Sequence, residues 1–558
     1  MNHNVEIHCS MLFNSYAFIF AFLPVTITGF FILRRVSNTS LTLGWLTLCS
    51  LFFYGWWKWE FLALILTSIA VNLAFAKLLL VEGRPQQLRK ALLIVGITFN
   101  LSLLGFFKYA DFFITNVNAL TSSSLSLLNV LLPIGISFIT FQKIAFLVDA
   151  YKGTVRDFTA LNFCFFVTFF PQLIAGPIVH HSEVMPQLKG ADPRRFSEDL
   201  GIGVSLFIVG LFKKVIIADS IAVYADAGYG AIATGQALDF ASAWITVLAY
   251  SFQLYFDFSG YSEMALGLAR IFGIRLPLNF YSPYKAHSII EFWRRWHITL
   301  SRFLRDYLYI PLGGNRKGPA RRYVNFMIVM LLGGLWHGAS WNFVLWGGLH
   351  GAMLMINHAW RSTPMAKFSI TQTCAAYMLG VAVTFFAVSL AWVPFRSLDF
   401  DNALTMLGYL SPLGTGTGVS VKYFVYAQFL NLDGGRWFVA PELWPPEMPA
   451  NYLAVQVRPV GLALMFVALL TFAMPNTLQL FGKYIPALSL EAFQQSAAKT
   501  FNPFGLVLSR ISRLTGIGLD SVGGIRVLDN RWAFIFAFMF VLSVLGLSRI
   551  SPFLYFQF

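Results

Sequence analysis

Long apolar runs recur along the whole chain, and they constrain its fold more than any other feature of the sequence. A helix that crosses a bilayer needs about 20 mostly apolar residues. Runs of this kind predict spanning helices at 11–33, 41–57, 60–81, 91–107, 127–149, 201–222, 237–257, 324–346, 376–394, 459–475 and 533–549. We therefore expect an all-α integral membrane protein, a polytopic helical bundle of about 11–13 membrane elements.

The composition excludes several classes of protein. Hydrophobic residues make up 57% of the 558 residues and charged residues 12%, whereas soluble domains average roughly 45–50% and about 25%. An ordinary water-soluble enzyme, a disordered tail protein and a nucleic-acid binder are therefore excluded. We assign the net charge of +15 to cytoplasmic loops and to contact with anionic lipid. The four cysteines are far apart and form no C-x-x-C pair, so neither disulfides nor a cysteine metal site are expected.

Two apolar regions do not have the pattern of a single straight membrane-spanning helix. The stretch 162–179 is interrupted by Pro171, Gly176 and Pro177, which predicts a re-entrant or kinked segment buried in protein. The stretch 341–360 forms either part of a longer span or a separate short span after a turn near Gly338.

The chain is expected to fold as one membrane domain. Residues 396–458 and 476–532 are polar links with short amphipathic pieces, and neither is long enough for a separate domain. We divide the chain into a possible N-terminal extension, 1–10, and a single membrane domain, 11–558, with a catalytic core at about 160–360. Translation from Met1 and from Met11 are both compatible with the sequence.

Basic residues follow alternate spans, which predicts the orientation of the chain. The link between the second and third spans holds only Lys58 and Glu60. Because cytoplasmic loops are enriched in Lys and Arg, we expect the basic links to lie in the cytoplasm. The protein is then a bacterial inner-membrane protein whose N-terminus lies in the periplasm. The basic residues of these links are Arg34 and Arg35; Arg84, Arg89 and Lys90; and Lys152 and Arg156.

The densest basic stretch is 270–322. It holds eleven Lys or Arg residues and two acids, a net charge of +9, with tryptophans and tyrosines between them. This mixture is typical of helices that lie at a cytoplasmic membrane interface. Anchoring to the lipid surface and attraction of an anionic cytosolic substrate both explain the pattern, and both can hold.

His337 lies inside the apolar segment LLGGLWHGASWNFVLWGGLHG. Ionisable groups at membrane depth are costly, usually face the protein interior and often mark functional sites. Gly333, Gly334 and Gly338 remove side-chain bulk nearby, so another backbone or a thin acyl chain could approach closely. The alternative is a packing histidine bonded to a neighbouring carbonyl group.

His297 lies in EFWRRWHITLSRFLRDYLYIPLGG. On one continuous helix, Trp293, Trp296 and Leu300 would share a face, with the arginines on another. A functional histidine and an interfacial histidine are equally compatible with this pattern. No H-x-x-x-H or H-E-x-x-H pattern joins the histidines, so no metal site is expected.

Four further histidines are expected at positions that are accessible to water. His180 and His181 follow the Gly-Pro break and are interpreted as solvated loop residues, and His350 and His358 as residues near a wet helix end. No G-x-S-x-G elbow, P-loop or G-x-G-x-x-G motif is present.

Polar residues enter the apolar segment 250–269, YSFQLYFDFSGYSEMALGLA. Buried carboxylates there need partners or water. Asp257 and Glu263 are expected to orient a histidine, bind a cation or pair with Arg270, unless this is a polar helix end near the headgroups. The candidate substrate-binding residues here and beside the two histidines are Gln253, Asp257, Tyr261, Arg294, Arg295, Trp336 and Asn342.

Several of these segments together resemble the membrane-bound O-acyltransferases, specifically the bacterial AlgI-like branch that supplies acetyl groups to exported polysaccharides. The resemblance covers nearly the whole chain. Its segments are MLFNSYAFIFAFLP (11–24), PQLIAGPI (171–178), 250–274, NFYSPY (279–284), FWRRWHITLSRFLRDYLYIPLGGNR (292–316), GGLWHGASWNFVLWGGLHG (333–351) and FLYFQF (553–558).

The resemblance implies a catalytic histidine at His337 and a second functional position at His297. It also implies acyl-CoA, most simply acetyl-CoA, as the donor substrate with no bound cofactor, and periplasmic or membrane-anchored acetyltransferase proteins as partners. Alginate, cellulose and peptidoglycan all remain open as the polymer. Two other classes remain: a transporter or channel that uses intramembrane His and Asp residues, and a non-catalytic subunit of an export complex.

Overall fold

The computed structural model describes most of the chain, and every structural statement below concerns that part. Residues 1–10, where an extension was expected, lie outside it. The described residues are 11–36, 38–155, 158–188, 196–367, 373–411, 432–433, 436–437, 450–491, 493, 524–525, 527–548 and 554.

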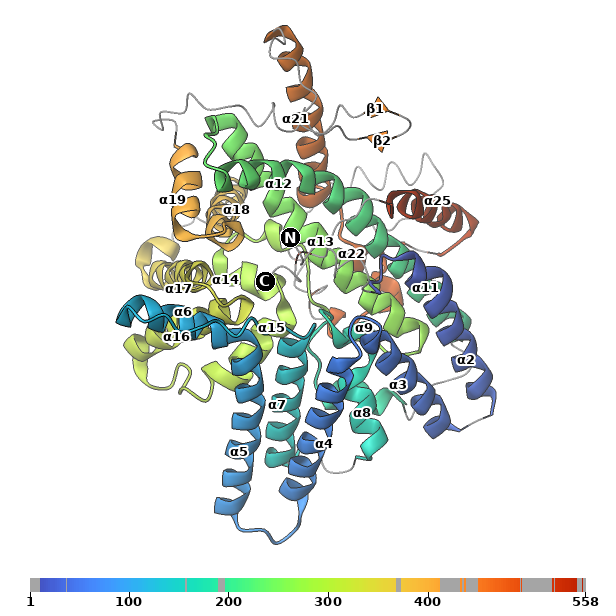
Figure 1. The fold of residues 1–558 in the computed structure, drawn as a ribbon. Helices are drawn as coiled ribbons and strands as arrows, with labels where there is room; N and C mark the ends of the chain where they lie inside the picture. Colours follow the sequence, from blue (N-terminus) through green and yellow to red (C-terminus); the bar gives the residue numbers. More distant parts are fainter. Residues whose placement is uncertain are drawn as a thin grey trace.

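Helices dominate the described chain (Figure 1). The first half contains η1 (Phe18–Phe22), α2 (Leu23–Arg35), α3 (Thr39–Gly55), α4 (Glu60–Leu80), α5 (Gln86–Leu104), η2 (Gly105–Tyr109), α6 (Ala110–Thr121), α7 (Ile136–Lys152), α8 (Ala160–Thr168), α9 (Phe170–Leu173), α10 (His181–Leu188), α11 (Phe196–Phe212), η4 (Lys213–Ala218), α12 (Asp219–Ala233) and α13 (Phe240–Ile271).

The second half contains η5 (Pro283–Lys285), α14 (Ile289–Arg295), α15 (Ile298–Leu304), η6 (Arg305–Tyr309), α16 (Gly318–His337), α17 (Trp341–Ser362), η7 (Pro364–Lys367), α18 (Cys374–Arg396), α19 (Phe400–Tyr409), α21 (Ala450–Phe472), α22 (Thr477–Leu480), η10 (Gly482–Tyr484) and α25 (Asn530–Gly546). The short strands β1 (Leu432–Asp433) and β2 (Arg436–Trp437) form one antiparallel pair.

Five continuous helical stretches in the described chain are long and apolar enough to cross a membrane. Three shorter apolar helices accompany them: Thr39–Gly55, Val460–Phe472 and Asn530–Gly546. The prediction of an all-α, multi-pass membrane protein is confirmed, while the total of eleven to thirteen membrane elements stays a prediction. The five stretches are Phe18–Arg35, Glu60–Leu80, Gln86–Thr121, Phe196–Ala233 and Cys374–Arg396.

Helix α13 runs through the middle of the molecule, beside α11 and α12 (Figure 1). From Tyr250 to Ile271 every residue of α13 is buried. Its glycines allow α11 to approach closely: a Cβ atom on Gly210 would lie 2.5 Å from the Gly260 carbonyl oxygen, and one on Gly267 would lie 2.5 Å from the Gly203 carbonyl oxygen. Small residues at a helix contact permit such backbone approach in membranes.

Several expected spans have wrong boundaries; the spans 91–107 and 201–222, for example, lie within the longer helical stretches Gln86–Thr121 and Phe196–Ala233. Residues 127–135 are not helical, and α7 begins only at Ile136, because Gly135 has a left-handed φ of +73° and Pro133 precedes it. The span 324–346 is two helices, so the alternative with a turn near Gly338 is the right one. The span 237–257 continues to Ile271, because the polar residues beyond 257 are accommodated inside the bundle.

The segment 162–179 is broken, as its prolines predicted. Helix α8 ends at Thr168, Phe169 is not helical, and α9 then lasts only four residues. Its residues from Phe165 to Val179 are all buried, which satisfies the requirement that irregular backbone at membrane depth lies within protein.

Contacts at the lower end of α4, α5 and α7 in Figure 1 bring two basic links together. The Arg89 guanidinium donates to the Tyr151 carbonyl at 2.8 Å, and the Lys152 ammonium lies 5.6 Å from the centre of the Tyr307 ring. The links after α4 and after α7 therefore share one end of the bundle with η6, inside the basic stretch 270–322. The side of the membrane that this end faces stays a prediction.

We expect Gly210→Val to destabilise the protein. The added side chain meets the α13 backbone, and overpacking of this kind costs about 1–3 kcal/mol. Gly201→Val on the same helix is the matched control, since a Cβ atom there meets nothing within 4 Å. Thermal unfolding of both purified variants in detergent measures the effect. Equal melting temperatures would show that the α11–α13 contact is not tight.

Candidate functional site

His337 is the last residue of α16, and its backbone is held by η2. The Lys108 ammonium donates to the carbonyl oxygens of Trp336 (2.6 Å) and His337 (2.9 Å). The Tyr109 hydroxyl donates to the Leu335 carbonyl at 2.9 Å. The last carbonyl groups of a helix have no partner within the helix. Lys108 and Tyr109 therefore cap the C-terminal end of α16, where His337 lies.

The His337 side chain is buried among aromatic rings. Its ring centre lies 4.9 Å from that of Trp336, 5.1 Å from that of Trp346 on α17 and 5.3 Å from that of Phe395 on α18. It also lies within electrostatic reach of His297, His350 and Lys108. The expectation of an interior-facing imidazole is confirmed.

The glycines near His337 make room for backbone. A Cβ atom on Gly334 would overlap the Phe343 carbonyl group, and one on Gly347 would overlap the Met330 carbonyl group. The sequence predicted that either another backbone or an acyl chain could approach these glycines. In the structure the backbone of α17 lies there. Access for an acyl chain stays a prediction.

His297 lies between two short helices. It has a left-handed backbone, with φ +42°, and it precedes α15 while α14 ends at Arg295. The expected continuous helix with Trp293, Trp296 and Leu300 on one face is therefore wrong. Trp296 is buried against Tyr284, Phe292 and Trp392 instead of lying at a lipid surface.

Asn279 holds the His297 ring in one orientation. The Asn279 Oδ1 atom accepts the Thr299 hydroxyl at 2.9 Å and lies 3.0 Å from His297 Nδ1. Because a carboxamide oxygen only accepts, Nδ1 must carry the proton, and Nε2 is left with a lone pair. Nε2 is buried and has no hydrogen-bond partner in the described residues. The buried His297 imidazole can therefore accept a proton at Nε2.

Trp336 contacts both histidines. Its ring centre is 6.3 Å from that of His297 and 4.9 Å from that of His337. Phe138 and Phe141 of α7 pack on the same indole, at 5.5 and 5.1 Å. Phe258 of α13 contacts His297 at 4.9 Å. Helices α7, α13, α16, α17 and α18 thus bring two histidines forty residues apart into one aromatic cage.

His350 is a third buried histidine, and the expectation that it lies at a wet helix end is wrong. Its exposed fraction is 0%, because Trp293, Trp346 and Trp392 surround it. Neither of its ring nitrogens has a hydrogen-bond partner within the described part of the chain. The i, i+4 spacing from Trp346 was a signal for an interior face that sequence reasoning missed.

The acids of α13 form ion pairs instead of orienting a histidine. Asp257 pairs with Lys214 at 2.8 Å, and Glu263 pairs with Lys213 at 2.7 Å. Arg270, the expected partner, pairs with Asp199 at 2.8 Å. All three α13 residues are buried, so the interpretation as a polar helix end near the headgroups is also wrong.

The other candidate substrate-binding residues are dispersed. Gln253 and Tyr261 are buried on α13, and Tyr261 stacks on Phe13. The Asn342 amide donates to the Ser397 carbonyl at 3.0 Å, which ties α17 to the end of α18. Of these candidates, Trp336 is the one seen to contact both histidines.

The basic stretch 270–322 carries less unpaired charge than its composition indicates. Arg295 pairs with Glu291, and Arg302 donates to both oxygens of Glu183, which lies outside the stretch. Asp199, also outside, pairs with Arg270. The charges that remain exposed include Arg294, Arg316, Lys317 and Arg321.

His180 and His181 are not solvated loop residues. His181 is buried against Phe146 and Phe166, and this burial lowers the pKa of its imidazole to about 4. His180 is half-buried, with Nδ1 3.0 Å from the Tyr307 hydroxyl, which itself donates to Asp149.

Lys108 and Asn279 are the site residues that sequence reasoning missed. Lys108 is the one charged residue in the apolar stretch 91–110, a signal for a buried cation with a partner. Asn279 lies in the NFYSPY segment, where no pattern indicates its contact with a histidine 18 residues later.

Comparison with known proteins places this chain in a family. The model of the MBOAT, membrane-bound O-acyltransferase family, matches residues 51–395. A peptidoglycan O-acetyltransferase of Helicobacter pylori is 46% identical over 424 residues, which cover 71% of this chain and 79% of the relative. A probable alginate O-acetylase AlgI of Pseudomonas aeruginosa is 35% identical over 568 residues, covering 98% and 100%. A teichoic acid D-alanyltransferase of Streptococcus thermophilus is 32% identical over 244 residues, covering 42% and 58%.

We expect Lys108→Met to destabilise the end of α16 that carries His337. The substitution keeps the apolar stem but leaves two buried carbonyl oxygens without their donor, at a cost of about 2–4 kcal/mol. Lys77→Met, at an exposed position on α4, is the control and should change stability by less than about 0.5 kcal/mol. Chemical unfolding in detergent micelles checks both. If Lys108→Met matches Lys77→Met, Lys108 does not cap α16.

Proposed function

Because the chain belongs to the membrane-bound O-acyltransferase family, we propose that this acyltransferase moves an acetyl group from cytosolic acetyl-CoA across the inner membrane toward an exported polysaccharide. The named relatives favour peptidoglycan or an alginate-like polymer as the final acceptor. The observation that carries the proposal is that the buried His337 and His297 rings both contact Trp336.

His337 acts as the general base in this proposal. Its imidazole takes the proton from an acceptor hydroxyl group while that oxygen attacks the thioester carbonyl carbon. The C–S bond then breaks, the oxygen keeps the acetyl group, and the CoA sulfur leaves with the electron pair and takes up a proton. General-base catalysis contributes about 10²–10⁴-fold, and the fixed geometry of the buried site supplies the remainder through positioning.

His297, which also contacts Trp336, supports the same chemistry. Its protonated Nδ1 faces Asn279, so Nε2 is the atom that binds the acceptor hydroxyl or relays its proton. The aromatic walls keep bulk water away, which protects a thioester from hydrolysis.

Exposed cations support a donor that arrives from the basic end of the bundle. Arg316, Lys317 and Arg321 are exposed just after η6, and Tyr307 of η6 lies 5.6 Å from the Lys152 ammonium. CoA is strongly anionic, so these cations raise its local concentration by attraction. On the proposed orientation this end faces the cytoplasm, the N-terminus is periplasmic, and a periplasmic or membrane-anchored acetyltransferase completes transfer to the polymer.

We expect His337→Gln to lower acetyl-CoA turnover by about 10²–10⁴-fold, because the general base is lost. The measurement is release of CoA thiol by the purified enzyme with a soluble acceptor, together with acetylation of peptidoglycan and alginate in cells. His358→Gln, on the same α16–α17 hairpin, is the matched control. Turnover that survives in His337→Gln at unchanged protein level would refute the assignment.

We expect Asn279→Ala to reduce kcat about tenfold or more, because the His297 ring loses the acceptor that fixes its tautomer. Asn279→Asp keeps an acceptor oxygen and should recover most of kcat. Measuring kcat and KM of both variants separates a role in orienting His297 from a merely structural one. If both variants unfold or lose activity equally, Asn279 does not act through His297.

A further inference from the structure

A cavity outside the histidine site opens between η4, α12, α13 and α21, with a volume of about 560 Å³. Ligand pockets typically have about 300–1,000 Å³. Most of its wall is apolar, and one group of its polar side chains, Lys213, Ser282, Asn476 and Thr477, lies where α13 faces α22. Neither His337 nor His297 lines it.

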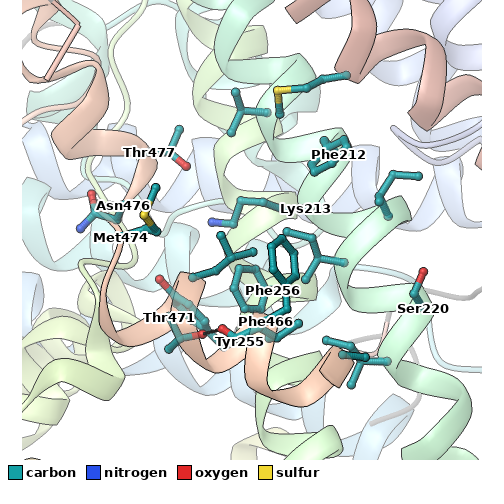
Figure 2. Close-up of a pocket in the computed structure, with 18 of the residues that line it drawn as sticks. Phe212, Lys213, Ser220, Tyr255, Phe256, Phe466, Thr471, Met474, Asn476 and Thr477 are labelled. Carbon is teal, nitrogen blue, oxygen red and sulfur yellow. Dashed lines mark hydrogen bonds between the residues drawn. The ribbon is translucent and has the colours of Figure 1, made fainter. Parts of the chain in front are cut away.

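The Lys213 ammonium is the polar group that reaches into this cavity. Figure 2 shows the side chain extending from its helix toward Asn476, Met474 and Thr477 on the opposite wall. Glu263 Oε1 accepts one of its N–H bonds at 2.7 Å, and the rings of Tyr255 and Phe256 flank it. An ammonium group has three donors, so donors remain for a ligand in the cavity.

The neighbouring polar side chains are already bonded to one another. Asn476 Nδ2 donates to Ser282 Oγ at 2.8 Å, and the Thr477 hydroxyl donates to Glu263 Oε2 at 2.9 Å. The Thr471 hydroxyl donates to the Val467 carbonyl within α21. A ligand therefore meets the Lys213 ammonium at one end of the cavity, and the rest of the wall is mostly apolar.

The cavity adjoins a surface suited to lipid. Phe466 lines the cavity and is also 59% exposed, so it forms part of the rim. Leu462, Met465 and Leu469 on the same helix are each more than half exposed. In a multi-pass membrane protein such an apolar helix face contacts hydrocarbon chains, and a chain can enter beside Phe466 without crossing water.

From this geometry we propose that the cavity binds one fatty-acyl chain of a membrane glycerophospholipid, whose ester carbonyl oxygen accepts a hydrogen bond from Lys213. Charge favours a neutral ester over a carboxylate or phosphate at this point. The Lys213–Glu263 pair is already neutral and buried, and a further anion would add unbalanced charge in a medium of low dielectric. The phosphate headgroup then lies outside the cavity.

The bound chain supports α21 against the bundle. Ala463, Val467 and Leu470 of α21 face the cavity from one side, while Ile217 and Ile221 face it from the other. A filled cavity gives these side chains contact partners that an empty one lacks. The lipid is a structural component here, independent of the acyl-transfer reaction.

Variants on α21 separate the cavity from the lipid-facing surface. Ala463→Trp fills the cavity, because Ala463 lines it, whereas Leu462→Trp adds the same side chain at a neighbouring position that is 60% exposed. Ser220→Phe fills the cavity from α12 and serves if Ala463→Trp does not fold. Lys213→Met combined with Glu263→Gln removes the buried pair without leaving one charge alone.

Native mass spectrometry of the full-length protein released from gentle detergent tests the proposal. The wild type and Leu462→Trp should retain one glycerophospholipid per chain. Ala463→Trp or Ser220→Phe should retain at least about tenfold less, since each excluded methylene group costs about fourfold in affinity. Equal retention by all variants, or retention of detergent or free fatty acid alone, would overturn the proposal.

Thermal unfolding with added lipid identifies the recognised group. Phosphatidylethanolamine and phosphatidylglycerol should raise the Tm of delipidated wild type equally, and oleate should not. Both phospholipids should raise the Tm of Leu462→Trp, and both should raise the Tm of Ala463→Trp by less. In the Lys213→Met and Glu263→Gln double variant the rise should be smaller. Stabilisation by phosphatidylglycerol alone, or by oleate, would contradict recognition of the ester.

Discussion

Charge buried on one long helix constrains the rest of the bundle. Asp257, Glu263 and Arg270 of α13 each pair with a residue of α11 or η4, namely Lys214, Lys213 and Asp199. Removal of one partner from such a buried pair costs about 3–5 kcal/mol. The same interface contains the glycine contacts that bring the two backbones together. The ion pairs and the glycines at the contact therefore together determine how α13 packs against α11 and η4.

The histidine site depends on this arrangement indirectly. Helix α13 presents Phe258 to His297, and the irregular segment that follows α13 carries Asn279, which holds that imidazole. On the other side, Lys108 caps the helix that ends at His337. Each histidine is thus positioned by a polar residue from a distant segment, while aromatic rings exclude water around both. An acyltransferase that handles a thioester benefits from a rigid and dry reaction site.

Sequence patterns predicted the structure correctly where a feature of the local sequence was sufficient to determine it. The Pro171 and Pro177 breaks, the turn near Gly338 and the interior position of His337 all follow from local chemistry, and all are found. Prediction failed where partners were remote. The acids of α13 were expected near Arg270 or a histidine, yet their lysines lie 43 and 50 residues earlier in the chain. His297 was assigned to a continuous helix because helical periodicity does not report a single left-handed residue.

By itself the sequence determined that this is a helical membrane protein, since only backbones that satisfy their own hydrogen bonds can carry so many apolar residues through lipid. It also determined which residues are able to do acid–base chemistry. Tertiary structure decided that His297 and His337 share Trp336, that His350 joins the interior, and that Asn279 leaves Nε2 of His297 unprotonated. These outcomes depend on contacts between segments far apart in the chain, where each partner's position is set by packing of the whole bundle instead of by its neighbours in sequence.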